Sequence, residues 1–594
     1  MYNISSSCEV LWFSREGGVE SLFSKTEKAQ VAPSGIAGVA ETLVGAGAVW
    51  LSVKGGNIGE PNTSGSNYID PNESGSDVIG CSWSKDIQSP AGVFNLQVKP
   101  RIPYDRLIRP GDLFVIFMDN DHRFGASHRA DGTLITIGLV DRVGLSTSVD
   151  AQGATIKVVS ISGRDLGAIF QETQTLFDPA FAQVDQELYR GKFLTQITER
   201  MVGALSPVEV VYTILDLIYN QNATGSELVG AQWTLPGRGE DGRPVSLLSL
   251  INVTSFVQAP MYGYAFAGGL GVTEAGNVWS LIEGFANLLV NEFFFDVRDF
   301  RKDEINFLRY QEDAAIGAHI TDDDVKRQRA LRDEMRTSGV WNQSTLESNV
   351  GSPSGTPPPV MALIHRQTPY DRDAFNHLPF NNLNYDEIFD TDLSYSAHDI
   401  VNFFQVNFPD LPVIQQELTF GVLINEASIR QYGLRRCSPQ SRFPFVTSTV
   451  GDNFVEGKTI KGVFEDAFRY YTELQATWYA ANDKLRAGSI SCRFRPDIRV
   501  GTRLRVIQED KSVLAFYVQG VNQVFGVSPG ASRTQLTVVR GVVEGRPGLV
   551  NNLVFKNGRM SIPEGMISFR YTSAIKGTEV KQLTYPGLLL EVER

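Results

Sequence analysis

The segment from Gly451 to Thr459 comes closest in this chain to a loop that could bind phosphate groups. It reads Gly-Asp-Asn-Phe-Val-Glu-Gly-Lys-Thr and lies between an expected strand over residues 445–450 and an expected helix. In that setting, backbone N–H groups and a lysine can hold the phosphates of a nucleotide. One residue too many separates the two glycines, and Asp452 and Glu456 would repel phosphate. The sequence therefore favours no nucleotide site, and a nucleotide-using motor is the weaker alternative.

Other residue types that carry chemistry also lack the required spacing. The loop Asp119–Gly125 differs from a calcium loop because its glycine is one place late and Ala130 stands where a glutamate is needed. The six histidines show no ligand spacing such as His-Glu-x-x-His, and no Gly-x-Ser-x-Gly nucleophile motif is present. We therefore expect no catalytic residue, no metal ligand and no cofactor site, so the chain is predicted not to be an enzyme. A pair of distant carboxylates would leave no pattern in a sequence, so a peptidoglycan hydrolase remains an alternative.

Arginines are concentrated in two places, and their role depends on which side of a strand they occupy. Arg435 and Arg436 are adjacent, and a second group follows at positions 493, 495, 499, 503 and 505. On a strand, Arg493 and Arg495 would share one face, opposite Cys492 and Phe494. The group is either a solvated strand face or a charged face against a neighbouring subunit or an enclosed channel.

Length and composition indicate a large globular protein. With 594 residues and about 150 residues per domain, three or four domains are expected. The net charge of −13 argues against a broad surface that wraps nucleic acid. Four scattered cysteines do not form a disulfide framework, and residues 1–8 do not read as a secretory signal. Residues 35–53 are nearly uncharged but too short and too rich in glycine for a spanning helix, so no stable membrane insertion is expected.

A pattern of strands and turns occurs twice, in the same order. The first copy contains Phe94–Val98, the turn Arg109-Pro-Gly-Asp112 and strands up to Arg164, and the second contains Ile490–Phe494, the turn Arg495-Pro-Asp497 and strands up to Gly541. A duplicated β module in one chain provides equivalent surfaces at two places.

We expect an α+β multidomain fold with two tube-like antiparallel β-barrel domains and mixed helical and α/β middle domains. Helices are expected after the cap Asn277 and from about 460 to 486, where Gly488 would follow the helix end, and a buried strand is expected at Phe293–Val297. The expected segments are a Gly/Ser-rich N-terminal extension (1–89), a first barrel (90–165), a helical and α/β body (166–350), a second mixed section with a long helix (360–488), a second barrel (489–545) and a C-terminal tail (546–594).

Several short motifs, in their order along the chain, resemble the baseplate hub proteins of contractile-tailed bacteriophages and phage tail-like particles. The resemblance covers roughly residues 90 to 545. Its motifs are Ile161–Leu166, Asn277–Trp279, Phe293–Val297, Tyr432–Arg436, Arg495–Thr502, Phe516–Asn522 and Arg540-Gly541.

The resemblance implies a structural virion protein, the central hub that joins a hexameric tail tube to a trimeric spike as a symmetry adaptor. Such a hub is a homotrimer whose subunits each carry two tube-like barrels, which gives six equivalent units. The implied partners are a tail-tube or tube-initiator protein and a central spike protein, with baseplate wedge and tape-measure proteins as further candidates. DNA would pass through the lumen without specific binding. The implied location is the tail baseplate of a virion assembled in the bacterial host cytoplasm, and a tail-associated peptidoglycan hydrolase is the alternative function.

Overall fold

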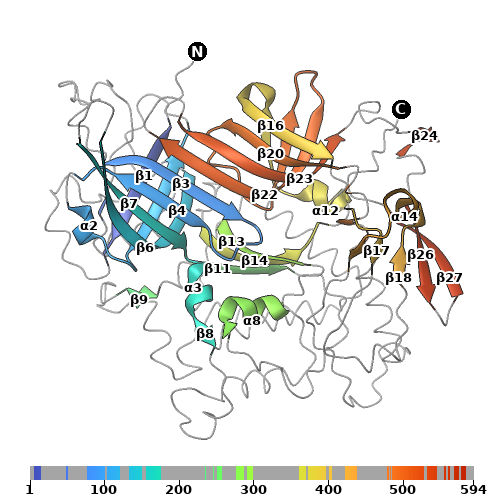
Figure 1. The fold of residues 1–594 in the computed structure, drawn as a ribbon, viewed down its shortest axis with the longest axis horizontal. Helices are drawn as coiled ribbons and strands as arrows, with labels where there is room; N and C mark the ends of the chain where they lie inside the picture. The colour runs from blue at the N-terminus through green and yellow to red at the C-terminus, as the bar shows by residue number, and fades with distance from the viewer. Residues whose placement is uncertain are drawn as a thin grey trace, which may run out of the picture.

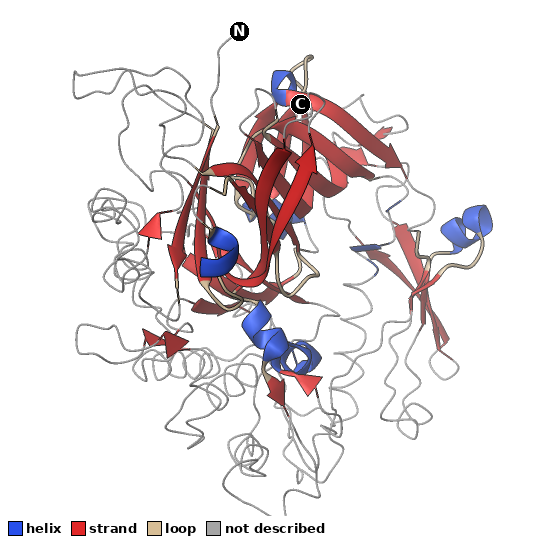
Figure 2. Cartoon of the chain, turned by 60° about the vertical axis from the view of Figure 1, so that its left-hand side comes forward, coloured by secondary structure: helices blue, strands red, loops and turns tan. Residues whose placement is uncertain are grey.

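The structure is a computed structural model of the full chain. Strands dominate the part of the chain that it describes, and the helices there are few and short (Figures 1 and 2). The described residues are 6–14, 49–50, 77–100, 103–120, 133–149, 155–175, 234–235, 245–246, 251–256, 276–285, 291–298, 360–369, 372–395, 400–404, 422–437, 476, 478–479, 482, 485–526, 531–544, 554–556, 559–561, 567–573 and 577–583.

One 13-stranded sheet, antiparallel in all pairs but one, runs through the molecule and contains both copies of the duplicated pattern. Figure 1 shows the first group of strands in blue to teal on the left and the second in orange to red, with β16 in yellow. The first group is β1 (Ser7–Phe13), β2 (Val49–Trp50), β3 (Val78–Asp86), β4 (Val93–Val98), β5 (Leu113–Asp119), β6 (Thr133–Val149) and β7 (Thr155–Asp165). The second group is β15 (Phe380–Asn384), β16 (Ile388–Tyr395), β20 (Arg486–Arg493), β21 (Arg503–Ile507), β22 (Val513–Gly526) and β23 (Arg533–Glu544).

The two groups repeat the same pairing scheme. In the first, neighbours follow the order β3-β4-β7-β6-β5-β1, and in the second the order β16-β20-β23-β22-β21-β15. Two irregularities of register also recur: Val78/Gly80 in β3 matches Ile388/Asp390 in β16, and Val140/Arg142 in β6 matches Val518/Gly520 in β22. Because bulges mark fixed points in a sheet, these matches align the two groups residue by residue.

The turn before β5 in the first group and the turn before β21 in the second each depend on a glycine with positive φ. Gly111 has φ 91° and donates from its N–H to the carbonyl of Val140 at 2.7 Å, while Gly501 has φ 69° and donates to Val518 at 2.8 Å. Glycine adopts this conformation without the strain that a Cβ would cause. The turn equivalent to Arg109–Asp112 is therefore Arg499–Thr502. The sequence match of the first turn to Arg495-Pro-Asp497 was wrong, because a shared Arg-Pro pair outweighed the glycine that the turn requires.

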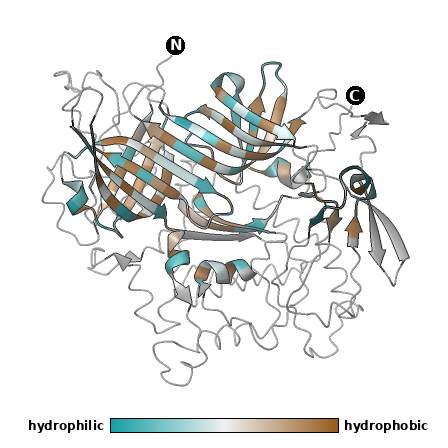
Figure 3. Ribbon diagram, in the orientation of Figure 1, coloured by the Kyte–Doolittle hydropathy of each residue, from teal (hydrophilic) through white to brown (hydrophobic). Residues whose placement is uncertain are grey.

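Each group encloses its own apolar core. Side chains alternate between buried and exposed along β4, as is typical of a strand with one face in a core. Figure 3 shows hydrophobic and hydrophilic residues alternating along strands of the large sheet. The first core includes Trp12, Trp83, Phe94 and Phe114, and the second includes Phe294, Leu504 and Phe516.

Smaller elements lie beside the large sheet. Asn277 accepts a hydrogen bond from the N–H of Ser280 at 2.8 Å and caps α8 (Val278–Phe285), which confirms the expected cap. The expected strand is also confirmed: it is β13 (Asn291–Arg298), the edge of a three-stranded sheet with β14 (Val360–Gln367) and β11 (Ile251–Phe256). The other elements are α2 (Tyr104–Leu107), α3 (Ala168–Glu172), β8 (Gln174–Thr175), β9 (Thr234–Leu235), β10 (Val245–Ser246), β12 (Gly276–Asn277), α12 (Arg372–His377), η4 (Tyr385–Glu387), β17 (Phe403–Phe404), β18 (Val422–Ile424), α14 (Glu426–Tyr432), β19 (Arg436–Cys437), β24 (Val554–Lys556), β25 (Arg559–Ser561), β26 (Ile567–Ser573) and β27 (Gly577–Leu583).

Two predicted boundaries differ from the observed strands. β1 and β3 fall within residues 1–89, yet both belong to the sheet of the first group. Gly488 does not follow a helix end: it lies inside β20, where its φ is 151° and an added Cβ would come within 1.8 Å of the Asp392 carbonyl oxygen. The close approach of a neighbouring strand, and not a helix end, explains the glycine at this position. The mainly antiparallel sheet is established, while the division into an α+β multidomain protein stays a prediction.

Candidate assembly surface

The two strand groups are joined by direct pairing of one strand from each. Residues 80–86 of β3 pair antiparallel with residues 520–526 of β22, from Gly80 opposite Gly526 to Asp86 opposite Gly520. Backbone hydrogen bonds thus continue from one group into the other, and the edge of neither strand is open at this seam.

Side chains reinforce the seam from both sides. Phe494 and Phe525, which belong to the second group, are buried in the core of the first. The buried guanidinium of Arg499 donates to the main-chain carbonyls of Leu134 and Ile135 at the start of β6. Asn120 donates from Nδ2 to the carbonyl of Phe494 at 3.0 Å. The second group is therefore fixed to the first by apolar burial and by hydrogen bonds to the backbone.

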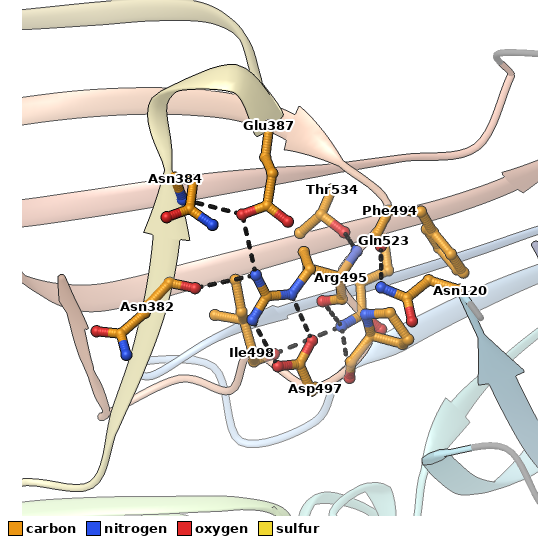
Figure 4. Close-up of polar contacts among 11 residues, drawn as sticks. Asn120, Asn382, Asn384, Glu387, Phe494, Arg495, Asp497, Ile498, Gln523 and Thr534 are labelled. Atoms are coloured by element: carbon orange, nitrogen blue, oxygen red, sulfur yellow. Dashed lines mark hydrogen bonds and ion pairs between the residues drawn. The ribbon is translucent and has the colours of Figure 1, made fainter. Parts of the chain in front are cut away.

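Arg495 holds the β15–β16 segment against the body of the second group (Figure 4). Its guanidinium makes two hydrogen bonds of 2.9 Å to Asp497, donates to the carbonyl of Asn382 at 3.0 Å and lies 3.5 Å from Glu387. The hydrogen bond to Asp497 raises the pKa of Arg495, although burial opposes this. A bidentate contact between a guanidinium and a carboxylate fixes the orientation of both groups in addition to attracting them.

The remaining arginines of this group do not form one solvated face. Arg493 is exposed, whereas Arg499 and Arg503 are buried. Burial lowers the pKa of Arg503, and Glu544, at 4.0 Å, opposes this. Arg505 lies 2.9 Å from the same carboxylate. The arginines at 495, 499, 503 and 505 thus serve internal contacts within and between the strand groups.

Two further arginines tie the three-stranded sheet to the turn at Gly501. Arg298 donates to the carbonyl of Val500 and Arg366 to that of Gly501, both at 2.6 Å. Arg366 also pairs with Glu292 at 2.9 Å. Sequence reasoning missed this network, because its members are far apart in the chain and show no common spacing.

A buried ion pair fixes the end of β3 in the first group. Lys85 Nζ lies 3.4 Å from Asp165 Oδ2, and the Asp165 carboxylate also accepts from the N–H groups of Gly92 and Gly167, each at 2.8 Å. Burial raises the pKa of Asp165 to about 6, while Lys85 and the two N–H groups oppose the rise. The residue in the place of Lys85 in the second group is Tyr395 of β16.

Two strand edges that are equivalent to the seam remain open among the described residues. No described strand pairs with the outer edge of β16, nor with residues 142–149 of β6 on the side where residues 133–139 pair with β5. Large apolar side chains are exposed there: Leu145 is 48% exposed, Phe389 60% and Tyr395 54%. Exposed apolar edges of this kind mark association surfaces.

One cavity of about 1040 Å³ adjoins the second group, lined in part by Glu292, Trp478 and Arg540. Glu292 is engaged by Arg366 and by the Tyr517 hydroxyl, and burial raises the pKa of that tyrosine. No cluster of three or more His, Cys, Asp or Glu that could hold a metal occurs in the described residues, and none of their helices is long and apolar enough to cross a membrane. His365 is buried in β14 beside Phe293, which is a packing position.

Several residues singled out in the sequence lie outside the described part of the chain. These are the phosphate-loop candidate 451–459, residues 121–130 of the calcium-like loop, and most of the predicted long helix. Arg435 and Arg436 follow α14, where the side-chain oxygen of Asn402 accepts from the N–H of Arg435 at 2.7 Å.

Comparison with known proteins gives structural matches only. No protein-family model and no curated protein matches the sequence. A tail protein from Neisseria meningitidis MC58 matches with a TM-score of 0.37 and 11% identity, over 78% of this chain and 92% of that one. The 43 kDa tail protein of prophage MuSo2 from Shewanella oneidensis gives 0.36 and 10%, over 78% and 92%.

A third match is an Escherichia coli component of the type VI secretion system, described as structurally similar to T4 bacteriophage tail proteins. Its TM-score is 0.30 at 8% identity, over 87% of this chain and 91% of that one. Two of these three structures are phage tail proteins and the third is a type VI secretion component. TM-scores this low leave the functional argument to the strand pairing of the chain itself.

Proposed function

We propose that this chain is a structural protein of a phage tail or tail-like particle, the central baseplate hub that joins a hexameric tube to a trimeric spike. The single observation that supports this is the equivalence of the two strand groups, which share one order of strand pairing and two bulges at equivalent places. Two similar units per chain allow three chains to present six similar units. A protein with this property can meet sixfold symmetry on one side and threefold symmetry on the other.

The proposed partners are two further copies of the chain, a tail-tube or tube-initiator protein, and a central spike protein. Wedge and tape-measure proteins belong to the wider set, and DNA would cross the lumen without specific binding. The proposed location is the tail baseplate of a virion assembled in the host cytoplasm.

Co-expression with the tube and spike proteins of the same particle tests this function. The hub should co-purify with both proteins. Light scattering of the hub–spike complex should give the mass of three hub chains and one spike trimer. Co-purification with neither partner would contradict the proposal.

We also propose that the chain has no catalytic activity. Zymography on peptidoglycan with the purified protein should give no clearing band. A band that disappears on substitution of a single carboxylate would identify the hydrolase alternative instead.

A further inference from the structure

The seam inside the chain shows how the second half of β22, the long strand of the second group, pairs with a strand of the neighbouring group. In β22, residues 513–517 pair with β21, and on the same side residues 520–526 pair with β3 of the first group. The opposite side of β22 pairs with β23 throughout. Both edges of β22 are therefore satisfied, and Gln523 and Phe525 on its inward face are buried.

β6 is the equivalent strand, and the described strands cover only half of that side. Residues 133–139 pair with β5, and the opposite side pairs with β7. The matched bulges place Val143 at the position of Val521, Leu145 at that of Gln523 and Thr147 at that of Phe525. Leu145 and Thr147 are exposed, whereas all three residues of β22 are buried.

β16 is the equivalent of β3. Its outer edge should therefore pair with the second half of β6, as β3 pairs with the second half of β22. β3 pairs with β4, and β16 pairs with β20, through the same irregularity of register. Trp83 and Lys85 of β3 are buried at the seam, while their counterparts are the half-buried Leu393 and the exposed Tyr395. The inward face of β16 thus shows the apolar pattern of a covered strand without its cover.

We propose that β16 of one copy pairs antiparallel with residues 143–148 of β6 in the next copy and so repeats between chains the seam that β3 and β22 form within one chain. This deepens the proposed hub function by naming the surfaces through which the ring closes. The pairing is head to tail, because one copy offers β6 and the other offers β16. A contact of this type closes into a ring when the rotation allows it.

Transferring the register of the internal seam gives the register between copies. Val143 lies opposite Tyr395, Leu145 opposite Leu393 and Thr147 opposite Thr391. The first two pairs bury exposed apolar surface on the inward face, and the third places two β-branched hydroxyl residues together, a favourable cross-strand combination. Ser146 and Asp392 lie opposite each other on the outer face.

The segment that carries this edge is held in place before assembly. Arg495 binds the Asn382 carbonyl at 3.0 Å, just before the turn into β16, and the side chain of Glu387 accepts from the N–H of Asn384 at 2.9 Å. β15 pairs with β21 along its full length. A fixed edge loses little conformational entropy on docking.

Engineered disulfides in the full-length chain test the pairing and its register. Ser146→Cys with Asp392→Cys places two thiols directly opposite, at a Cβ separation of about 4.5–5.5 Å. Ser146→Cys with Ser394→Cys is the matched control, on the same face but two residues out of register, where the separation is about 7–8 Å. Under mild oxidation, the first variant should give covalent dimers and trimers on a non-reducing gel, and the second should give several-fold less.

Single variants complete the design. Ser146→Cys alone and Asp392→Cys alone should not cross-link, whereas their mixture should give a dimer and nothing larger. The inference is overturned if Ser146→Cys with Asp392→Cys gives no cross-link, or if Ser146→Cys with Ser394→Cys gives as much. A trimer in light scattering without that cross-link would overturn the inference and leave the hub function standing. Covalent species larger than three chains would support the strand pairing and contradict the ring of three.

Discussion

The two strand groups share one pairing scheme but differ in what covers their edges. In the first group, β3 finds a partner within the chain, and its inward-facing Trp83 is 2% exposed. In the second group, no described strand pairs with the outer edge of the equivalent β16, and Phe389 and Tyr395 are among the most exposed large apolar side chains in the same set of residues. The sixth strands also differ, since β1 is antiparallel to β5 and β15 is parallel to β21. A duplicated unit therefore keeps its internal pairing while the strands at its flanks differ.

The largest effect is expected where the first group uses a buried ion pair that has no equivalent in β16. Asp165→Ala would leave the ammonium of Lys85 buried and without its carboxylate, which costs about 3–5 kcal/mol in comparable pairs. Thermal unfolding at pH 7.5 should show a clear loss of stability, and Tyr395→Ala, at the place of Lys85 in the second group, should show almost none. Equal losses would mean that both strand ends are already covered in the single chain.

The same carboxylate should make the stability of the first group depend on pH. Because its pKa in the folded protein is about 6, above the unfolded value of 3.8, the folded state binds more protons between these values. Its contribution is fully present below the unfolded pKa and is lost as pH rises through 6, by on the order of 3 kcal/mol. Asp165→Asn should remove this slope in unfolding measurements from pH 4 to 7. A slope that persists unchanged in the variant would contradict the assignment.

Gln523 of β22 and Leu145 of β6 occupy equivalent positions but should differ in how much stability they contribute. Gln523→Ala should cost about 1–3 kcal/mol, because its buried amide donates to the carbonyls of Pro496 and Ile498 at 3.2 and 3.4 Å. Leu145→Ala should change the stability of the single chain by no more than about 0.5 kcal/mol, because Leu145 is an exposed residue before assembly. Urea unfolding at low protein concentration measures both, and a large loss for Leu145→Ala would show that its edge is already covered.

The two equivalent turns are expected to show a smaller loss of stability than the buried amide of Gln523. Gly111→Ala and Gly501→Ala should each cost about 1–2 kcal/mol, because a side chain at positive φ is strained. Gly501→Ala should be the worse of the two, since its Cβ would also approach Arg366 Nη2 to 2.8 Å and Phe294 Cζ to 3.0 Å. Calorimetry on both variants tests the ranking, and a neutral Gly501→Ala would contradict the equivalence of the turns.

The sequence predicted the duplication and the strands β4 to β7 and β20 to β23, because alternation and β-branched runs are local signals. It misplaced the second turn, and it missed β1, β3, β15 and β16 as members of the modules. The pairing of these strands depends on partners far away in the chain, which periodicity does not reveal. Arg499 shows the same limit: its spacing suggested a strand face, whereas its role is to bind carbonyls of β6, more than 360 residues away in the chain.

The central claim is that two equivalent strand groups in each chain make a ring of three chains with six similar units. Cryo-electron microscopy of the particle that contains this protein tests it most directly, in the layer between tube and spike. We predict three chains in that layer, six similar sheets around the axis, and a strand pair between β16 and β6 at each junction between chains. Six chains or a single chain in that layer would contradict it.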